Sequence, residues 1–419
     1  MTLGHFCSSF CAATFEYDTP KIVHIKSKKV GFLNRLIQLA IISYIIGYVI
    51  IYKKGYQDTS PVQSAVITKV KGVALTDFAN EDFTPGVTDH SMYNRIWDVA
   101  DYVVPPDMND AFFVTTNLIV TPQDMGTCNE DANEVPDATC YGPENSTCVK
   151  DKPFPTGNGV QTGNCTETSP FLSKTNYSCE IKAWCPVEID VEPLGKKKAI
   201  LAKTADFTVL IKNTVIFTRF DIMRRNIAEH VNSTYLRGCF YDEDKNPRCP
   251  IFRLGDMVKN AYKGSDQSYS AIAVKGGVIG ININWDCNLD RSVDHCNPTY
   301  SFSRLDDPDA KIAKGWNFRY AHYKNYTSRT LFKAYGIKFV LNVQAKGGKF
   351  NVVPLILNIS SGLALLGIAI VLCDFVVLYV LKSRTYYQNQ KYQMVEAADQ
   401  EFEELFSQKK DKDFTVDYN

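Results

Sequence analysis

Two long apolar stretches lie at opposite ends of this chain, at residues 32–52 and 352–381. Each is long enough to cross a bilayer as a helix, which needs about 20 predominantly apolar residues. Residues 53–351 between them are far more polar and hold ten of the 13 cysteines. The pattern predicts a membrane protein with two spans, one large intervening domain, and short tails at residues 1–31 and 382–419. One helix cannot enclose a pore, but helices from several copies could.

The ten intervening cysteines indicate an oxidising compartment. They are even in number, occupy one polar segment and include no Cys-x-x-Cys pair, which favours five disulfides over a metal site. The same segment holds five Asn-x-Ser/Thr sequons, and this agreement predicts an extracellular location. The expected glycosylation sites are Asn145, Asn164, Asn176, Asn232 and Asn325.

The basic residues beside the spans predict the topology. Lysines including Lys28 and Lys29 precede the first span, and Lys382 and Arg384 follow the second. Positive residues prefer the cytoplasmic side of a membrane, so both termini are expected in the cytoplasm. The first 31 residues are too polar for a cleavable signal peptide, so the first span is expected to act as a signal anchor of a plasma-membrane protein.

The extracellular segment is predicted to be mainly β. Short β-branched and aromatic runs, several of them alternating between apolar and polar residues, are punctuated by Gly and Pro, which is typical of strands. Expected strands lie at 62–73, 112–120, 207–217, 271–285 and 337–344, and expected helices at 223–231 and 256–261. Residues 128–185 hold six of the ten cysteines and three sequons. This head subregion cannot bury a large core, so three disulfides are expected to staple it.

Charge and motif content argue against several functions. Basic and acidic residues are equal in number, at 46 each, so no global field favours nucleic acid as a partner. No Gly-x-x-x-x-Gly-Lys-Ser/Thr, His-Glu-x-x-His or Gly-x-Ser-x-Gly motif occurs, and the six histidines are isolated. We therefore predict no enzyme activity, no bound metal and no cofactor.

Basic residues in strand-like contexts are candidates for binding an anion. Lys69 and Lys71 are two apart on a predicted strand, so their side chains share a face. They mark either an anion site or a solvated edge strand, where lysine is common. Arg319 and Lys333 lie in aromatic contexts, with Asn317 nearby, and such residues can converge on a polyphosphate.

The second span carries a small and hydroxyl-bearing stripe. Leu357, Ser361, Ala364 and Ile368 follow i, i+4, i+7, i+11 spacing and therefore share one side of a helix, with Asn358 adjacent. Such a stripe suits either close helix packing or a water-facing pore wall.

Specific motifs identify the chain as similar to the ATP-gated cation channels of the ionotropic purinoceptor family, from about Tyr17 to Lys391. These motifs are Thr19-Pro20-Lys21, Lys69-Val70-Lys71-Gly72, Trp184-Cys185-Pro186, Trp285-Asp286-Cys287-Asn288, Asn317-Phe318-Arg319, Lys333-Ala334-Tyr335-Gly336 and Ser361 to Gly367. The resemblance implies a homotrimer with two helices per subunit and a β-rich extracellular domain. It also implies a pore for Na⁺, K⁺ and Ca²⁺ that opens when ATP binds between subunits.

The resemblance assigns roles to individual residues. Phosphate contacts fall on Lys69, Lys71, Asn317, Arg319 and Lys333, adenine recognition on Thr208, and a contact to base or sugar on Leu236. The implied disulfides are Cys128–Cys185, Cys140–Cys165, Cys148–Cys179, Cys239–Cys249 and Cys287–Cys296. Leu357 and Ser361 match the gate, with Asn358, Ala364 and Ile368 beside them. Tyr387 and Lys391 match a membrane-retention signal, and membrane lipid is the other expected partner.

Three other classes share parts of this pattern. An acid- or peptide-gated two-span trimeric sodium channel has the same topology, but its signatures are missing. A nucleotide-hydrolysing ectoenzyme would need carboxylates for a metal ion. A non-conducting adhesion protein would not need the serine-bearing stripe. The chain also departs from vertebrate members of the family at Ser360-Ser361, where smaller residues are usual near the gate.

Overall fold

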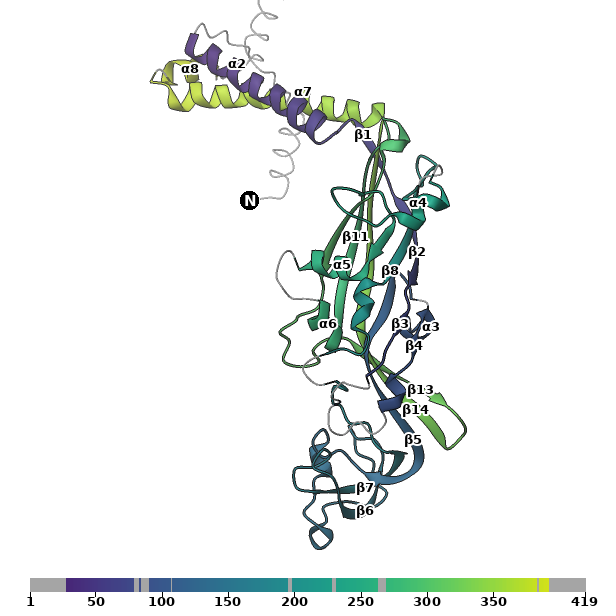
Figure 1. The fold of residues 1–419 in the computed structure, drawn as a ribbon. Coiled ribbons are helices and arrows are strands. Elements are labelled where there is room, and N and C mark those ends of the chain that lie inside the picture. The colour runs from purple at the N-terminus through teal and green to yellow at the C-terminus, as the bar shows by residue number, and fades with distance from the viewer. Residues whose placement is uncertain are drawn as a thin grey trace, which may run out of the picture. The chain divides into compact units, whose positions relative to one another are not determined.

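The computed structural model describes residues 28–78, 83, 90–106, 108–194, 198–227, 231–262, 269–382 and 384–391. The chain divides into two compact units (Figure 1). The helical unit comprises Met1–Asp58 and Phe350–Asn419, and the β unit comprises Thr59–Lys349. Most of the two predicted tails, residues 1–27 and 392–419, lies outside the described residues.

Two long helices form the described core of the helical unit. The first runs through α2 (Lys28–Ser43) and the π-helical segment η1 (Tyr44–Tyr52). The second runs through α7 (Val352–Phe375) and η7 (Val376–Val380), followed by the short helix α8 (Arg384–Lys391). Both long helices are long and apolar enough to cross a membrane. The described part of the first starts at Lys28, four residues before the predicted span.

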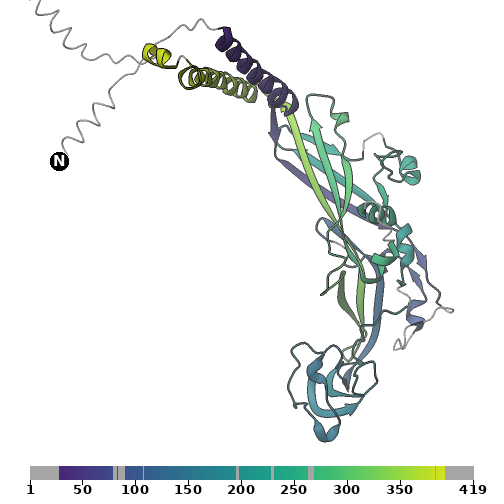
Figure 2. The ribbon, with the colours of Figure 1, turned by 90° about the vertical axis from the view of Figure 1, so that its left-hand side faces the viewer.

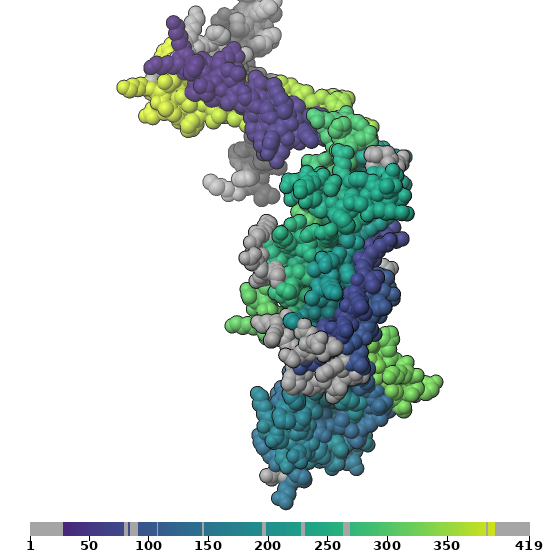
Figure 3. All heavy atoms as spheres, viewed as in Figure 1, coloured from purple at the N-terminus to yellow at the C-terminus, as the bar shows by residue number. Residues whose placement is uncertain are grey.

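The two long helices lie side by side (Figures 1 and 2), and in the space-filling view α2 rests against α7 (Figure 3). The fully buried residues of α7 are Gly362, Ala369 and Cys373, which lie on one side of the helix. Small residues there let the helix backbones approach closely, as is usual between membrane helices.

The β unit contains two main sheets. The larger has the order β12-β11-β14-β5-β7-β6, with β13 also paired to β14, and the smaller has the order β10-β8-β2, with β9 paired to β8. The β11–β14 pair is parallel, whereas the pairs β11–β12, β13–β14, β14–β5, β5–β7, β6–β7, β10–β8, β2–β8 and β8–β9 are antiparallel. The strands are β1 (Gln57–Ser60), β2 (Val62–Lys71), β5 (Ala111–Asn129), β6 (Val160–Glu167), β7 (Tyr177–Cys185), β8 (Thr208–Phe217), β9 (Ile222–Arg225), β10 (Ile251–Arg253), β11 (Gly277–Asn288), β12 (Thr299–Arg304), β13 (Asn317–Tyr323) and β14 (Ser328–Phe350).

Short elements complete the β unit. A two-stranded sheet pairs β3 (Ala74–Leu75) with β4 (Ile96–Trp97). The described α-helices are α3 (Val99–Tyr102), α4 (Ser233–Gly238), α5 (Leu254–Ala261) and α6 (Tyr269–Lys275).

The core of the β unit lies where the two main sheets meet. Val209, Ile211 and Val215 alternate along β8 and are fully buried, as a strand with one covered face requires. A buried polar contact also joins the sheets: Trp285 Nε1 on β11 donates to Asn213 Oδ1 on β8 at 2.6 Å. The Asn213 amide in turn donates to the Ala65 carbonyl on β2 at 3.1 Å. This chain of bonds fixes one sheet against the other.

Two local predictions were wrong. Residues 223–231 were expected to be helical, but Met223–Arg225 belong to β9, because the edge of β8 offers backbone groups that Ile222–Arg225 satisfy in register. Residues 271–275 were expected to be strand but complete helix α6. Gly276 ends that helix with φ of +79°, a conformation that glycine adopts without penalty.

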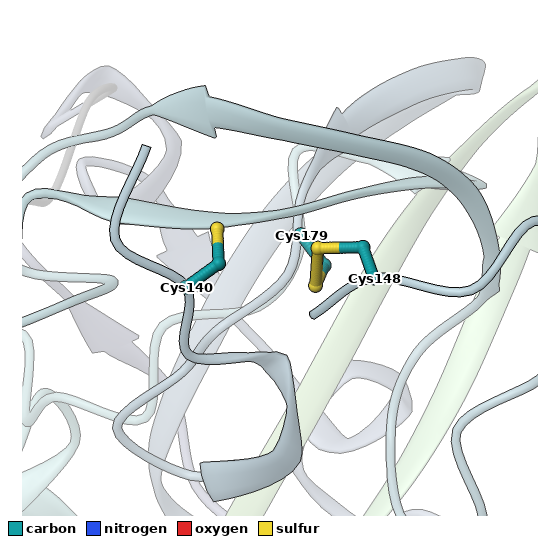
Figure 4. A group of neighbouring side chains, drawn as sticks. All are labelled: Cys140, Cys148 and Cys179. Atoms are coloured by element: carbon teal, nitrogen blue, oxygen red, sulfur yellow. A yellow bond between two sulfur atoms is a disulfide. The ribbon is translucent and has the colours of Figure 1, made fainter. Parts of the chain in front are cut away.

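The head subregion is stapled by three of the five disulfides. These are Cys128–Cys185, Cys140–Cys165 and Cys148–Cys179, while Cys239–Cys249 and Cys287–Cys296 lie elsewhere in the β unit. The pairing is the one that the family resemblance implied. Cys140, Cys148 and Cys179 cluster within metal-binding distance (Figure 4), but all three sulfurs are in disulfides and offer no thiolate.

Candidate functional site

One group of predicted ligands lies on the smaller sheet. Lys69 and Lys71 are both exposed, and Val70 between them is buried, so the two ammonium groups share the outer face of β2. In the antiparallel register Lys71 lies opposite Thr208 and Lys69 lies opposite Leu210. The strand pairing therefore places the predicted adenine contact directly beside the second lysine.

Packing beneath β2 fixes this group in place. Gly72 follows Lys71, and a Cβ at Gly72 would lie 2.3 Å from ring atoms of Phe207. The Phe207 ring also packs on Tyr102, whose hydroxyl donates to the Gly72 carbonyl at 2.8 Å. Because Phe207 directly precedes Thr208, the packing of Gly72 on Phe207 joins the end of β2 to the start of β8. Only glycine allows so close an approach.

A second group of predicted ligands lies on β13 and β14. Arg319 and Lys333 are opposite each other in the register, and Asn317 is opposite Tyr335. Residues two apart on a strand share a face, so these four side chains form one polar cluster. Arg319 is half exposed, whereas the Lys333 side chain is only 4% exposed.

Two carboxylates from the segment after β7 hold these cations. Arg319 Nη2 lies 2.8 Å from Glu188 Oε1, and its Nε is within 3.2 Å of both carboxylate oxygens. Lys333 Nζ lies 2.6 Å from Asp190 Oδ2 and 3.8 Å from Glu188 Oε1. The Tyr335 hydroxyl donates to Asp190 Oδ1 at 2.7 Å. A buried ammonium group therefore has the charged and hydrogen-bonded partners that its burial demands.

These contacts shift the pKa of Asp190, Arg319 and Tyr335. Burial opposes ionisation of Asp190, but hydrogen bonds from Lys333 and Tyr335 outweigh it and lower the pKa of the carboxyl group. The hydrogen bonds to Glu188 raise the pKa of Arg319. Burial and the neighbouring Asp190 raise the pKa of Tyr335. These directions favour an ionised Asp190 and Arg319, with Tyr335 as a neutral donor.

Sequence reasoning missed Glu188, Asp190 and Tyr335 as members of the site. A signal for the two acids does exist, since Glu188 and Asp190 are two apart in an extended segment directly after Cys185-Pro186. Nothing local shows that this segment lies across β13 and β14, because the contacts span more than 130 positions.

The structure does not unite all the predicted ligands within one chain. In the described part of the chain, no hydrogen bond or ion pair joins the β2–β8 group to the β13–β14 group. Among the described residues, the side chains of Lys69 and Lys71 have no hydrogen-bond or ion-pair partner, unlike those of Arg319 and Lys333. Leu236 lies half-buried on α4, which Asn232 caps by accepting from the Tyr235 N–H at 2.9 Å.

The predicted pore stripe is uncovered in the single chain. Leu357, Ser361, Ala364 and Ile368 are exposed on α7, away from the side that packs on the first span. Asn358 differs from them. Its side-chain amide donates to the Gly55 carbonyl at 2.8 Å and to the Pro354 carbonyl at 2.9 Å.

Comparison with known proteins covers nearly the whole chain. The family model described as ATP P2X receptor matches residues 15–394. The chain belongs to the ATP P2X receptor family. Mouse P2X purinoceptor 4 is 44% identical over 94% of this chain and 97% of its own length. Human P2X purinoceptor 5 is 43% identical over 93% of this chain and 84% of its own length.

Solved P2X structures share the fold. The crystal structure of a P2X receptor from the Gulf Coast tick, in the presence of ATP and Zn²⁺, has a TM-score of 0.76 at 50% identity. It covers 82% of this chain and is itself fully covered. The chicken P2X7 receptor with the competitive antagonist TNP-ATP has a TM-score of 0.68 at 38% identity, covering 82% of this chain and 98% of that chain.

Membership of the P2X family settles the broad class. P2X receptors are ligand-gated ion channels and not enzymes, and ATP is their ligand without any cofactor. The chain is thus a membrane channel of the ATP-gated cation class, with two candidate spans and a mainly β extracellular domain.

The remaining predicted residues have defined positions in this P2X chain but untested roles. Asn164, Asn176, Asn232 and Asn325 are exposed, as glycan attachment requires, while the side chain of Asn145 lies outside the described residues. Tyr387 lies half-buried on α8, and the side chain of Lys391 at the end of that helix lies outside the described residues.

Proposed function

We propose that this chain forms a homotrimeric plasma-membrane channel that extracellular ATP opens to Na⁺, K⁺ and Ca²⁺, with both termini in the cytoplasm. ATP binds between subunits, and the α7 helices of three copies line the pore. The ligands are Lys69, Lys71 and Thr208 from one side of the cleft, and Asn317, Arg319 and Lys333 from the other. Leu236 contacts the base or sugar.

The division of the cations into two groups carries this proposal. The β2–β8 group offers two exposed ammonium groups that form no ion pair with a described carboxylate, and like charges repel unless an anion lies between them. The β13–β14 group belongs to another sheet. A polyphosphate that reaches from one copy of the chain to the next satisfies both groups. The presence of ATP in the tick receptor structure, which is 50% identical, supports the same ligand here.

The charges also suggest how ATP drives opening. A ligand shifts a conformational equilibrium only through stronger binding to one of the states. Without ATP, the Lys69 and Lys71 ammonium groups repel each other and no anion joins them to the β13–β14 group, whose cations are paired with Glu188 and Asp190; a triphosphate that contacts both groups draws the cleft closed. We infer that Arg319 exchanges Glu188 for phosphate, because a phosphate that approaches the Nε–Nη2 edge of the guanidinium needs the N–H groups that Glu188 now occupies.

A single strand links the site to the pore. β14 carries Lys333 and continues without interruption to Phe350, and α7 begins at Val352. We infer that closure of the cleft displaces β14 along its length and turns the attached α7 helices, which separates Leu357 and Ser361 from their counterparts in the other subunits.

Whole-cell recording tests the proposal. Cells that express this chain alone should give a fast inward cation current when ATP is applied outside. Loss of one charge-assisted hydrogen bond costs about 1.5–3 kcal/mol, so Lys71→Ala should raise the ATP concentration for half-maximal current by about 10- to 150-fold. Lys182→Ala, which changes an exposed lysine on β7, is the matched control and should respond like the wild type.

Other outcomes would reject the proposal. A wild-type current that acid evokes and amiloride blocks, without a response to ATP, would favour the acid-gated sodium channel. An unchanged ATP response in Lys71→Ala would show that the assignment of the β2 lysines as ATP ligands is wrong. Crosslinking of surface-expressed chains should give a trimer, and a different stoichiometry would contradict the assembly.

A further inference from the structure

The outer ends of the two spans are joined through Asn358. Its side-chain amide donates two hydrogen bonds to backbone carbonyls, one at Pro354 in its own helix and one at Gly55 just past the first span. Asn358 is the seventh residue of α7 and lies within the predicted span, where few competing water molecules are expected. The bond to Gly55 therefore connects the two spans at a place where an unpaired amide is costly.

The chain around Gly55 is shaped for this contact. The Gly55 N–H donates to the Val49 carbonyl at 2.9 Å, which closes the last turn of the first span. A Cβ at Gly55 would lie 2.9 Å from the Val49 carbonyl oxygen and 3.1 Å from Asn358 Nδ2. Any larger residue must push away one of these groups. The backbone N–H of Asn351 also donates to the Tyr56 carbonyl at 3.1 Å, so the two chain segments stay paired beside the contact.

A second contact lies one helical turn further along α7. A Cβ at Gly362 would lie 2.7 Å from Ile45 Cδ1, and Ile45 is buried on the first span. Asn358 and Gly362 are four residues apart and thus share a side of α7 (Figure 3 shows the two helices in contact). Leu357 lies about 100° around the helix from Asn358. Holding Asn358 against the first span therefore fixes the direction in which Leu357 points.

We propose that the Asn358–Gly55 bond is an intrasubunit clasp that sets the rotation of α7 and stabilises the closed pore. In this role Asn358 is a positioning residue and not part of the pore wall. The inference rests on the proposed channel function, because it assumes that α7 lines the pore. The inference adds that the Asn358–Gly55 hydrogen bond must break or shift when the pore opens. The strength of this bond therefore sets the open probability without ATP.

The test uses the full-length chain and two single variants. Asn358→Leu keeps the side-chain size and removes the donor, and Gly55→Ala keeps the carbonyl but pushes it away. Interhelical hydrogen bonds in membranes are worth about 0.6–1.7 kcal/mol, which corresponds to about 3- to 18-fold. Each variant should raise the ATP-free current and lower the half-maximal ATP concentration within that range, with single-channel conductance unchanged. Gly47→Ala, in open space on the same span, is the matched control and should match the wild type.

The double variant distinguishes a clasp from two independent effects. If the two residues act through one bond, the combined change should equal that of either single variant. Full additivity overturns the proposal, as does a wild-type ATP response in Asn358→Leu. A changed single-channel conductance with unchanged open probability also overturns it, because that result places Asn358 in the pore wall.

Thermal unfolding of the purified trimer provides a readout without current. Both single variants should lower the melting temperature, and the double variant should lower it no further. Additive losses would overturn the clasp even if the channel were silent. An absent ATP current in the wild type would refute the channel proposal alone, so failures of the two proposals are distinguishable. Surface labelling identifies a variant that does not fold, and the other single variant then decides.

Discussion

Glu188→Gln tests whether the carboxylate beside Arg319 competes with ATP. Glu188 accepts from Arg319 through both Nε and Nη2, at distances from 2.8 to 3.2 Å. A phosphate that binds the same edge of the guanidinium would need these N–H groups. Replacing the carboxylate by an amide of the same size removes its charge while keeping the shape of the segment. The amide binds Arg319 more weakly than the carboxylate does, so ATP should displace it at a smaller cost in free energy.

The structure sets the size of the effect. The Arg319 side chain is 52% exposed, so solvent screens the ion pair, whereas the Glu188 side chain is only 7% exposed. Exposed pairs contribute about 0.2–1 kcal/mol, and the bidentate geometry places this one in the upper half of that range. Removing about 0.5–1 kcal/mol of competition should lower the half-maximal ATP concentration by about 2- to 5-fold.

Dose–response curves in cells that express each variant measure this shift. Glu192→Gln is the matched control, because Glu192 lies in the same segment but pairs with Lys275 at 3.6 Å. It should leave the curve in place. A shift of Glu188→Gln toward higher ATP concentrations would show that the carboxylate assists binding, and the idea of an exchange between Glu188 and phosphate would be wrong.

Three further predictions concern other parts of the β unit. Gly72→Ala should shift the ATP curve to higher concentrations with normal surface expression, because the added methyl meets the Phe207 ring and displaces Lys71 and Thr208; Gly126→Ala, in open space on β5, should not. Trp285→Phe should lower the melting temperature of the purified trimer, since it leaves the buried Asn213 oxygen unpaired at a cost of about 1–3 kcal/mol; equal melting temperatures would contradict that contact. Asp190→Asn should lower the melting temperature by the same amount at about pH 5 and about pH 7.5. The folded pKa of Asp190 lies below its ordinary value of 3.8, so the ionised carboxylate stabilises the fold fully above pH 3.8 and loses this effect only as the pH falls through the folded pKa. A loss of melting temperature that is smaller at pH 5 than at pH 7.5 would refute this.

Patterns that depend on neighbouring residues were readable from the sequence. The alternation along residues 62–71 and 208–217 predicted β2 and β8, because a strand with one buried face repeats every two residues. The apolar runs predicted both long helices because each run is long enough to cross a bilayer as a helix. Residues 223–231 failed because Ile222–Arg225 take their conformation from β8, a partner that is not adjacent in the sequence.

The site shows the same limit. The predicted cations came from motifs, and their register on β13 and β14 follows from the hairpin that joins the two strands. The acids that hold Arg319 and Lys333 come from a distant segment, and no periodicity signals that contact. Asn358 was predicted to lie beside the pore residues; its hydrogen bond to Gly55, a residue about 300 positions away, could not be read from the sequence.

β14 runs without interruption from Lys333 to Phe350, so the number of residues between Lys333 and α7 is set along one strand. Side chains alternate along a strand, so one residue inserted between Lys333 and Phe350 would turn Lys333 to the opposite face relative to everything that follows it. Two inserted residues would restore the face but would lengthen the strand by about 6.6 Å against its fixed partners β5 and β11. Under the proposed function, either change would disconnect the ATP site from the gate without altering any residue of either. This segment should therefore tolerate substitution on its outer face far better than any insertion or deletion.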